Sequence, residues 1–237
     1  MSLLELHGVC KHFGGLVANQ DVSFHVEARQ IVGLIGPNGA GKTTAFNCVA
    51  GFYAPDAGRI LLDGRDIGGS APQDCARAGI ARTFQVARTF ASMTALDNVL
   101  TAALLRRKRV AAAREQAQRW LAFVGLARLA QRGAGTLTIS EQRRLAVARA
   151  LAIEPRLLLM DEVMAGLNPS EVRDMVQVVL NIRHHGIACL IVEHVLEGIM
   201  PIADRIVVLD RGQKIADGTP AEVCTDPAVL RAYLGDA

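Results

Sequence analysis

The sequence has few aromatic residues, no closely paired cysteines and no long apolar run, and each shortage excludes a class of protein. Aromatic residues make up only 4% of the 237 residues, whereas hydrophobic residues make up 51%. A core of Leu, Val, Ile and Ala is therefore expected, and a disordered chain is excluded. The five cysteines are widely spaced and odd in number, which argues against a disulfide framework or a CxxC metal site.

Charge and hydropathy exclude two further classes. Lys and Arg total 26 and Asp and Glu total 23, and the resulting net charge of +3 is too small to indicate a nucleic-acid partner. The basic run 106–109 has no interleaved aromatic residues and is interpreted as a solvated face. The first residues do not resemble a signal peptide, and apolar stretches such as 187–192 are far shorter than a membrane span. We therefore expect any membrane role to depend on a partner protein.

Short apolar strands alternate with helical stretches along the chain, which predicts an α/β fold with a largely parallel, buried sheet. Strands are expected at 4–6, 23–26, 31–35, 58–63, 157–160 and 188–192, and helices at 42–50 and 114–124. The stretch 95–129 is rich in Ala, Leu, Arg and Gln, and it is expected to be helical. We predict a single domain over 1–237, with a core at about 1–85 and 152–222, a helical insertion at about 86–151 and a C-terminal tail at about 223–237.

The sequence GPNGAGKTT at 36–44 matches the phosphate-loop pattern GxxxxGK[ST] without a mismatch, between a predicted strand and a predicted helix. Its glycines allow backbone N–H groups to surround phosphate, and the helix N-terminus adds favourable partial charge. Lys42 can reach the β- and γ-phosphates of ATP, and the Thr43 hydroxyl can bind Mg²⁺. A glycine-rich turn that happens to carry a lysine is the alternative. The expected nucleotide-binding residues are Gly36, Asn38, Gly39, Ala40, Gly41, Lys42, Thr43 and Thr44.

Polar residues at the ends of two predicted strands complete a possible ATPase site. Asp161 and Glu162 follow a buried strand and are expected beside the phosphate loop, Asp161 as a Mg²⁺ ligand and Glu162 as general base for the attacking water. His194 follows a second buried strand, and its ring can bond a γ-phosphate oxygen. Gln85 precedes the helical insertion, and its amide can contact metal and water. An acidic turn after a core strand and a structural histidine are the alternatives.

These motifs occur in the order and rough spacing of the ABC transporter ATPases, and the resemblance covers nearly the whole chain. The segments HFGGL at 12–16, GIARTFQ at 79–85 and AGLNP at 165–169 resemble the branched-chain amino acid importer ATPases in particular. The resemblance implies a RecA-like P-loop core with an N-terminal antiparallel β layer and an inserted helical subdomain. It also implies that Phe13 stacks on adenine, for which a half-buried strand residue is the alternative.

One segment departs from the family pattern. The family's signature usually reads LSGGQ or LSYGQ, and here the corresponding residues 137–141 read LTISE. Thr138 keeps the hydroxyl that the resemblance places at the γ-phosphate bound by an opposing subunit. Ser140 replaces a glycine whose backbone approaches that phosphate, and Glu141 adds negative charge. The same residues form the pattern T-x-x-E of a capping box, so a purely structural helix cap is the alternative.

The resemblance implies an ATP-binding and ATP-hydrolysing subunit of an importer for branched-chain or related amino acids, with ATP and Mg²⁺ as cofactors. Implied partners are a second ABC ATPase subunit, identical or paralogous, transmembrane permease subunits and, indirectly, an extracytoplasmic substrate-binding protein. The implied location is peripheral, at the cytoplasmic face of the inner membrane, and no nucleic-acid partner is expected. Urea or amide import, lipopolysaccharide export, a soluble ABC-type ATPase and a non-hydrolysing ATP-binding module are the alternatives.

Overall fold

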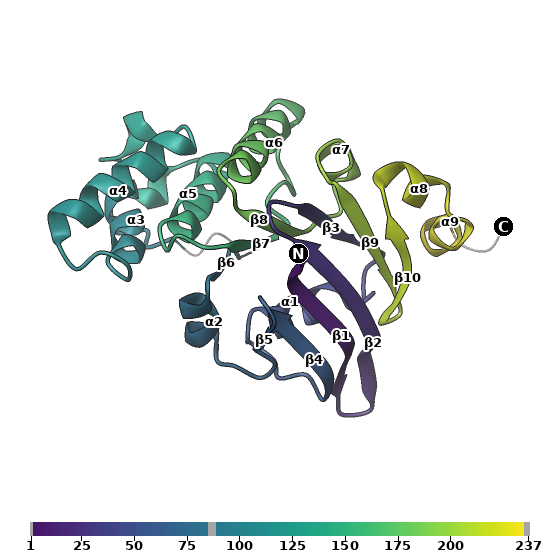
Figure 1. Ribbon diagram of the computed structural model, residues 1–237. Coiled ribbons are helices and arrows are strands. Elements are labelled where there is room, and N and C mark those ends of the chain that lie inside the picture. Colours follow the sequence, from purple (N-terminus) through teal and green to yellow (C-terminus); the bar gives the residue numbers. More distant parts are fainter. Residues whose placement is uncertain (1, 85–88, 235–237) are drawn as a thin grey trace.

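The computed structural model describes residues 2–84 and 89–234, and its centre is a six-stranded sheet (Figure 1). The strands are β3 (Ile31–Ile35), β6 (Ile80–Arg82), β7 (Leu157–Asp161), β8 (Ala188–Val192), β9 (Arg205–Asp210) and β10 (Gln213–Gly218). Their order is β10-β9-β3-β8-β7-β6, with β10 antiparallel to β9 and the other neighbours parallel. The carboxyl ends of β3, β7 and β8 therefore meet at one edge of the sheet.

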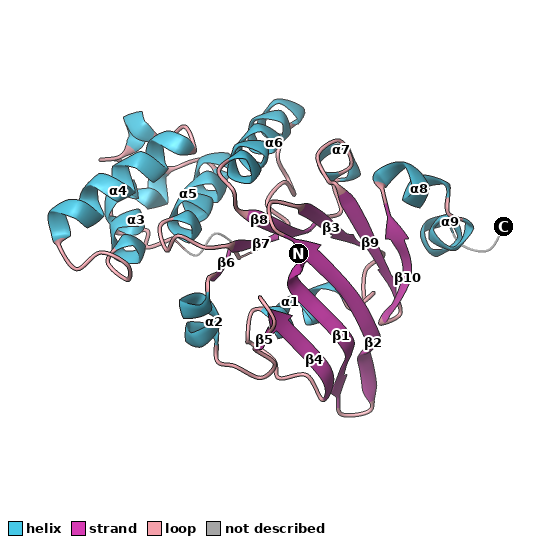
Figure 2. Ribbon diagram, in the orientation of Figure 1, coloured by secondary structure: helices cyan, strands magenta, loops and turns pink. Residues whose placement is uncertain are grey.

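A second, antiparallel sheet packs below the first in the view of Figure 2. It consists of β1 (Ser2–Phe13), β2 (Leu16–Glu27), β4 (Ala57–Leu62) and β5 (Arg65–Asp66), in the order β2-β1-β4-β5. Strands β1 and β2 are longer than the predicted 4–6 and 23–26. Apolar patterning underestimates them because their polar outer parts continue to pair through the backbone, as between Lys11 and Asn19 and between Phe13 and Leu16.

The parallel strands are buried on both faces, which explains their uninterrupted apolar sequences. In β7, Leu158 and Met160 belong to a core shared with the helices, whereas Leu157 and Leu159 belong to a core shared with the antiparallel sheet. Successive strand side chains point to opposite faces, so one short strand serves both cores. The α/β class with an N-terminal antiparallel layer is confirmed.

The helices begin and end close to the predicted positions. The expected helix at 42–50 ends at Val49, and the left-handed Gly51, with φ of 77°, stops it. The helix expected at 114–124 spans Val110–Phe123. The helices are α1 (Lys42–Val49), α2 (Pro72–Ala78), α3 (Ala95–Ala103), α4 (Val110–Phe123), α5 (Ile139–Leu151), α6 (Pro169–His184), α7 (Leu196–Ile199), α8 (Pro220–Thr225) and α9 (Pro227–Leu234), with short 3-10 turns at Ala127–Leu129 and Ala134–Thr136.

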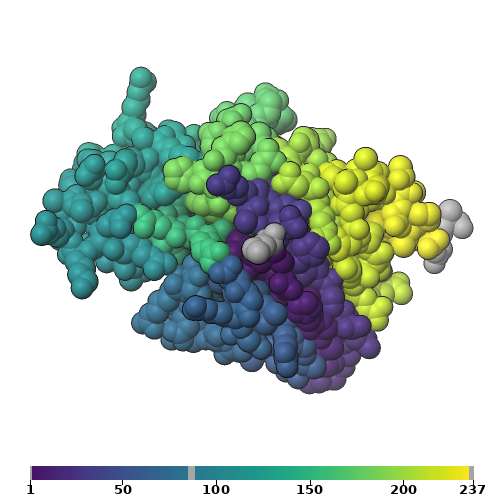
Figure 3. Space-filling model, in the orientation of Figure 1, coloured from purple at the N-terminus to yellow at the C-terminus, as the bar shows by residue number. Residues whose placement is uncertain are grey.

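Helices α3, α4 and α5 pack against one another and form the teal and green part that extends to the left in Figure 3. They fall within the predicted insertion at about 86–151, whose boundaries stay a prediction. Within residues 2–84 and 89–234, no helix combines the length and the apolar character that crossing a bilayer requires.

Candidate ATP-binding and hydrolysis site

The phosphate loop connects β3 to α1 and lies so close to neighbouring backbone that it has no room for larger residues at two glycines. A Cβ atom at Gly36 would lie 2.0 Å from the carbonyl oxygen of Leu209, and one at Gly41 would lie 2.4 Å from that of Ala18. Gly41 is the N-cap residue of α1 and has a φ of 94°. Because this cap residue has no side chain, α1 offers its first N–H groups to an external acceptor such as a phosphate.

Lys42 lies across this loop. Its Nζ donates hydrogen bonds to the carbonyl oxygens of Gly36, at 2.7 Å, and of Pro37, at 2.9 Å. The residue is only 9% exposed. Burial lowers the pKa of its ammonium group, while the carboxylates of Glu162 and Asp161 favour the charged form. The structure therefore brings the phosphate-loop lysine and the two acids into one electrostatic cluster.

Asp161 is the last residue of β7 and is 5% exposed. Its backbone N–H donates to Oγ1 of Thr83 at 3.3 Å, and its Oδ2 lies 3.6 Å from Nη2 of Arg82. Burial raises the pKa of its carboxyl group, and the positive charges of Arg82 and Lys42 oppose that rise. The side chain of Asp161 is thus held by the last residue of β6 and its backbone by the residue after that strand.

Glu162 and His194 meet at the ends of β7 and β8. Glu162 has a left-handed backbone, with φ of 50°, and its N–H donates to the carbonyl oxygen of Val192 at 2.9 Å. A guanidinium N–H of Arg143, in α5, donates to the Glu162 carbonyl oxygen. Nδ1 of His194 lies 3.6 Å from Oε1 of Glu162, and the histidine side chain is 54% exposed. The exposed ring of His194 therefore lies beside the partly buried carboxylate of Glu162.

Glu193 is a buried acid beside the candidate site that the sequence motifs do not single out. It is fully buried, and its Oε1 accepts a hydrogen bond from the N–H of Met164 at 2.7 Å. Burial raises the pKa of its carboxyl group, and the backbone hydrogen bond from Met164 opposes that rise. This bond ties the loop after Glu162 to the end of β8. The apolar run of β8 predicts a strand. It does not predict whether Glu193 or His194, the polar residues after the strand, points into the core.

Two further predicted residues come from other segments. Gln85 lies outside the described residues. Phe13 ends β1, and at 42% exposure it presents an aromatic surface to solvent. Its ring packs edge-on against Tyr53 with centroids 5.1 Å apart, and Nζ of Lys11 lies 5.5 Å from its centroid. Phe13 is therefore a half-exposed strand residue with an accessible ring.

Two models of known protein families match the chain. A family model described as "ABC transporter" matches residues 19–165, and one described as "Branched-chain amino acid ATP-binding cassette transporter" matches residues 213–237. The chain belongs to the ABC transporter ATP-binding family. It is an ABC-type ATPase, as the sequence predicted.

Relatives of this ABC ATPase cover nearly its full length. It is 44% identical to the high-affinity branched-chain amino acid transport ATP-binding protein BraF of Pseudomonas aeruginosa, over 99% of this chain and 98% of that protein. It is 41% identical to the high-affinity branched-chain amino acid transport ATP-binding protein LivG of Escherichia coli K12, over 99% of this chain and 98% of that protein. The lipopolysaccharide export system ATP-binding protein LptB of Haemophilus influenzae is 34% identical, over 100% and 98%.

Solved structures agree with the fold. The ADP conformation of MJ1267, an ATP-binding cassette of an ABC transporter, has a TM-score of 0.92 and 32% identity, with both chains covered completely. A nucleotide-free ATP-binding cassette has a TM-score of 0.91 and 32% identity, also over both complete chains. This similarity supports nucleotide binding by the ABC ATPase described here.

The segment that replaces the family's signature begins α5 of the ABC ATPase with a complete capping box. Oγ1 of Thr138 accepts a hydrogen bond from the N–H of Glu141 at 3.3 Å, and the N–H of Thr138 donates to Oε2 of Glu141 at 2.8 Å. The helix-cap interpretation is thus confirmed as local structure. Ser140 is only 4% exposed, whereas its neighbour Ile139 is 64% exposed. Ile139 therefore places an exposed apolar side chain at this helix start.

The oxygen atoms near the phosphate loop fit a Mg²⁺ ion. Thr43 is exposed in the first turn of α1, and Asp161 supplies a carboxylate at the end of β7, which β8 separates from β3 in the sheet. Among the described residues, no three His, Cys, Asp or Glu side chains gather as a metal cage. Mg²⁺ uses one or two carboxylates together with water and substrate phosphates, so a sparse set of protein oxygens suits it.

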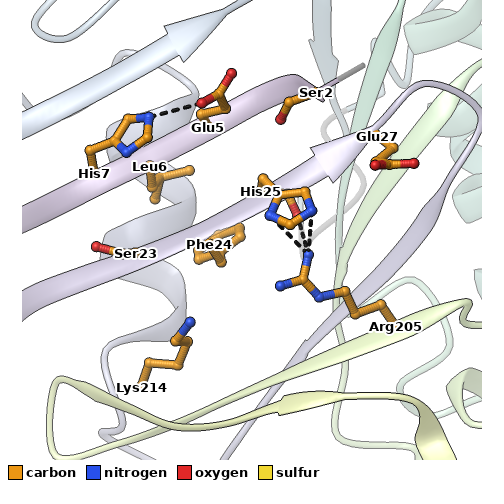
Figure 4. A pocket seen from close by; sticks show the side chains of 10 residues that line it. All are labelled: Ser2, Glu5, Leu6, His7, Ser23, Phe24, His25, Glu27, Arg205 and Lys214. Atoms are coloured by element: carbon orange, nitrogen blue, oxygen red, sulfur yellow. Dashed lines mark hydrogen bonds and ion pairs between the residues drawn. The ribbon is translucent and has the colours of Figure 1, made fainter.

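A cavity of about 360 Å³ lies elsewhere in this ABC ATPase, between the edge of the antiparallel sheet and β9 and β10 (Figure 4). Arg205 lines this cavity. Its guanidinium group contacts the ring of His25 and binds both carboxylate oxygens of Asp217, at 2.5 and 2.7 Å. No residue of the phosphate loop lines this cavity. Because Arg205 and Lys214 both pair with Asp217 within the chain, we interpret the cavity as structural.

Proposed function

We propose that this ABC ATPase supplies energy for the import of branched-chain or related amino acids through a membrane permease. The observation that supports this cargo is the match of residues 213–237 to the family described as "Branched-chain amino acid ATP-binding cassette transporter". The relatives at 41–44% identity, which are named for branched-chain amino acid transport, support it further. Lipopolysaccharide export is the second candidate, because LptB is 34% identical over the whole chain.

The phosphate-binding part of the mechanism rests on the loop and on Lys42. Backbone N–H groups of the loop and of α1 surround the β- and γ-phosphates. Lys42 exchanges its bonds to the carbonyl oxygens of Gly36 and Pro37 for bonds to phosphate oxygens, and it neutralises part of their charge. The exposed ring of Phe13 stacks on adenine.

The hydrolytic part rests on the ends of β7 and β8. Thr43, Asp161 and Gln85 hold Mg²⁺, which when bound supplies positive charge to the phosphate oxygens. The Glu162 carboxylate accepts a proton from the attacking water. His194 has its Nδ1 near Glu162, which leaves its Nε2 for a γ-phosphate oxygen.

The functional unit that we propose is a head-to-tail pair of ABC ATPase subunits, identical or paralogous. Each ATP lies between the phosphate loop of one subunit and Thr138 and Ser140 of the other, so ATP favours the closed pair by contacting both subunits. Permease subunits dock near Gln85 and the helical insertion, and a substrate-binding protein delivers cargo on the far side. The ATPase is then a peripheral protein at the cytoplasmic face of the inner membrane.

Reconstitution tests the cargo. The ATPase and its co-purifying membrane subunits are placed in lipid vesicles, and a substrate-binding protein loaded with leucine, isoleucine or valine is added. ATP hydrolysis is expected to rise, and labelled amino acid is expected to accumulate on the side of the ATPase. Stimulation by lipopolysaccharide or by a urea-loaded receptor, without a response to amino acids, would contradict the cargo and leave the ATPase assignment standing.

A further inference from the structure

Arg82, the last residue of β6, joins three elements of the ATP site. Its Nη1 donates a hydrogen bond to Oδ1 of Asn47, in α1, at 2.7 Å. Its Nη2 lies 3.6 Å from Oδ2 of Asp161, and the two side chains are only 13% and 7% exposed. The next residue, Thr83, accepts the backbone N–H of Asp161 at 3.3 Å. Arg82 and the residue that follows β6 thus hold the carboxylate and the backbone of Asp161.

Three phenylalanine rings surround the guanidinium group of Arg82. Its Cζ lies 5.0 Å from the ring centroid of Phe46, 4.7 Å from that of Phe52 and 4.6 Å from that of Phe84. Phe46 is fully buried, whereas Phe52 is 46% exposed and Phe84 is 36% exposed. A cation is attracted to aromatic faces, more strongly where it is shielded from water. Two of the three rings around Arg82 therefore reach the surface.

These two rings border the space between the core and the helices. Phe52 and Phe84 line an apolar groove of about 260 Å³ beside α2. Phe84 also lines a second groove of about 170 Å³, whose other wall includes Ala102 of α3 and Ala146 of α5. Arg82 lines both grooves. Phe84 thus lies beside the helical insertion, near which a permease is proposed above to dock, and Phe52 lies in the adjoining groove.

We propose that Arg82 is a positioning residue that sets the place of the Asp161 carboxylate, and that Phe52 and Phe84 set the place of Arg82. Permease contact at the two rings then changes the affinity of the ATP site for Mg²⁺. The inference rests on the proposed role of Asp161 as a Mg²⁺ ligand. A guanidinium group suits this role because it is planar, permanently charged and able to stack on rings while its nitrogen atoms face Asn47 and Asp161. A lysine ammonium cannot do all of these at once.

The test measures Mg²⁺-dependent binding of a fluorescent ATP analogue to the full chain, a readout without turnover. Arg82→Met is expected to raise the Mg²⁺ concentration for half-maximal binding by about 10–100-fold, as loss of an outer partner of a metal ligand does. Arg82→Lys is expected to fall in between. Arg156→Met is the matched control, because it removes an exposed arginine that pairs with Asp63 at 2.9 Å, and it should leave the midpoint unchanged. An unchanged midpoint in Arg82→Met, or equal midpoints in the Met and Lys variants, overturns the inference.

Phe52→Ala tests the connection to the surface. It is expected to shift the same midpoint in the native chain and to add nothing in the Arg82→Met background, because it acts through Arg82. Additive shifts in the double variant overturn this connection. Melting temperatures of the variants show whether Arg82→Met folds. If it does not fold, Arg82→Lys replaces it in both binding experiments.

Asp161→Asn separates this inference from the proposed function. If Asp161→Asn does not weaken Mg²⁺-dependent binding, the metal role of Asp161 fails, and the inference fails with it. If Asp161→Asn weakens binding and the Arg82 variants do not, only the role of Arg82 fails.

Discussion

Helices α1 and α5 both begin at segments assigned here to ATP, but their first turns are built in opposite ways. The N-cap of α1 is Gly41, which has no side chain and adopts a left-handed φ of 94°. The N-cap of α5 is Thr138, which exchanges two hydrogen bonds with Glu141 in a capping box. Helix α1 therefore leaves its first N–H groups to a ligand, whereas α5 satisfies some of its own with a hydroxyl and places a carboxylate beside them.

This difference indicates how each segment takes part in ATP binding. The α1 site is built from backbone, so it binds phosphate within a single subunit and needs glycines to do so. The start of α5 is already stable without a ligand, and the charge of Glu141 opposes an approaching phosphate. We therefore expect α1 to determine nucleotide affinity of the monomer and α5 to affect only the closing of two subunits. The following predictions test that division, from the largest expected effect to the smallest.

The first prediction concerns whether α5 receives ATP at all. Glu162→Gln removes the proposed general base and is expected to lower the rate of ATP hydrolysis by about 10²–10⁴-fold. ATP should still bind, because the phosphate loop and Lys42 are unchanged. An ATP-dependent dimer should then accumulate, which size-exclusion chromatography with and without ATP measures. Wild-type turnover in the assembled transporter would show that the role of Glu162 is wrong.

A dimer that forms in Glu162→Gln also bears on α5. If a Thr138→Ala change in the Glu162→Gln background leaves the ATP-dependent dimer fully intact, the threonine hydroxyl makes no contact across the interface. The capping box would then be the whole role of that residue.

The second prediction concerns the backbone geometry of α1. Gly41→Ala places a Cβ atom 2.4 Å from the carbonyl oxygen of Ala18, in a left-handed conformation. It is expected to lower the free energy of unfolding by about 1–3 kcal/mol and to weaken ATP binding by the monomer. Gly39→Ala is the matched control for stability, because Gly39 also has a positive φ, of 79°, but has no atom within 4 Å of an added Cβ. Urea unfolding of both variants should show the larger loss for Gly41→Ala.

The sequence predicted the phosphate loop well because its chemistry and its backbone geometry require the same residues in one short segment. The strand-end position of Asp161 and Glu162 followed from the apolar run before them. The ring cluster around Arg82 could not be predicted, because its partners at 46, 52 and 84 come together only in the folded chain. Local patterns carry no information about such contacts.

Strand ends show the same limit of local patterns. The full length of β1 was not evident, because its outer residues are held by backbone pairing with two neighbours and not by apolar alternation. The inward turn of Glu193 was not evident either, because it depends on the N–H of Met164, which lies 29 residues earlier in the chain. Boundaries and buried polar partners therefore required the structure.

The third prediction concerns the hydroxyl in the α5 cap. Thr138→Ala is expected to lower the free energy of unfolding by about 0.5–2 kcal/mol through loss of the cap, with unchanged ATP affinity of the monomer. Thr219→Ala is the matched control, because Thr219 and Glu222 form an equivalent capping box at α8. Both variants should lose similar stability, but only Thr138→Ala should weaken the ATP-dependent dimer. Equal dimerisation in the two variants would leave Thr138 a structural cap alone.

The last prediction concerns the charge of Glu141 and has the smallest expected effect. Glu141→Gln should lower the free energy of unfolding by about 0.3–1 kcal/mol, because a carboxylate near a helix N-terminus is favourable. It should also strengthen the ATP-dependent dimer, because a negative charge is removed from the surface that faces phosphate. Sedimentation at low and high salt measures this, and the gain should shrink in high salt, where the repulsion is screened.

Glu222→Gln at α8 provides the control for this change, because it removes the same charge from the same kind of capping box. It should reproduce the loss of stability without any gain in dimerisation. The two effects of Glu141→Gln have opposite signs, so a general weakening of the chain cannot mimic them. A weaker dimer in Glu141→Gln would mean that the start of α5 promotes closing of the dimer through its helical stability and that the charge of Glu141 does not oppose closing. Helices α1 and α5 would then differ in the rigidity of their first turns and not in their charge.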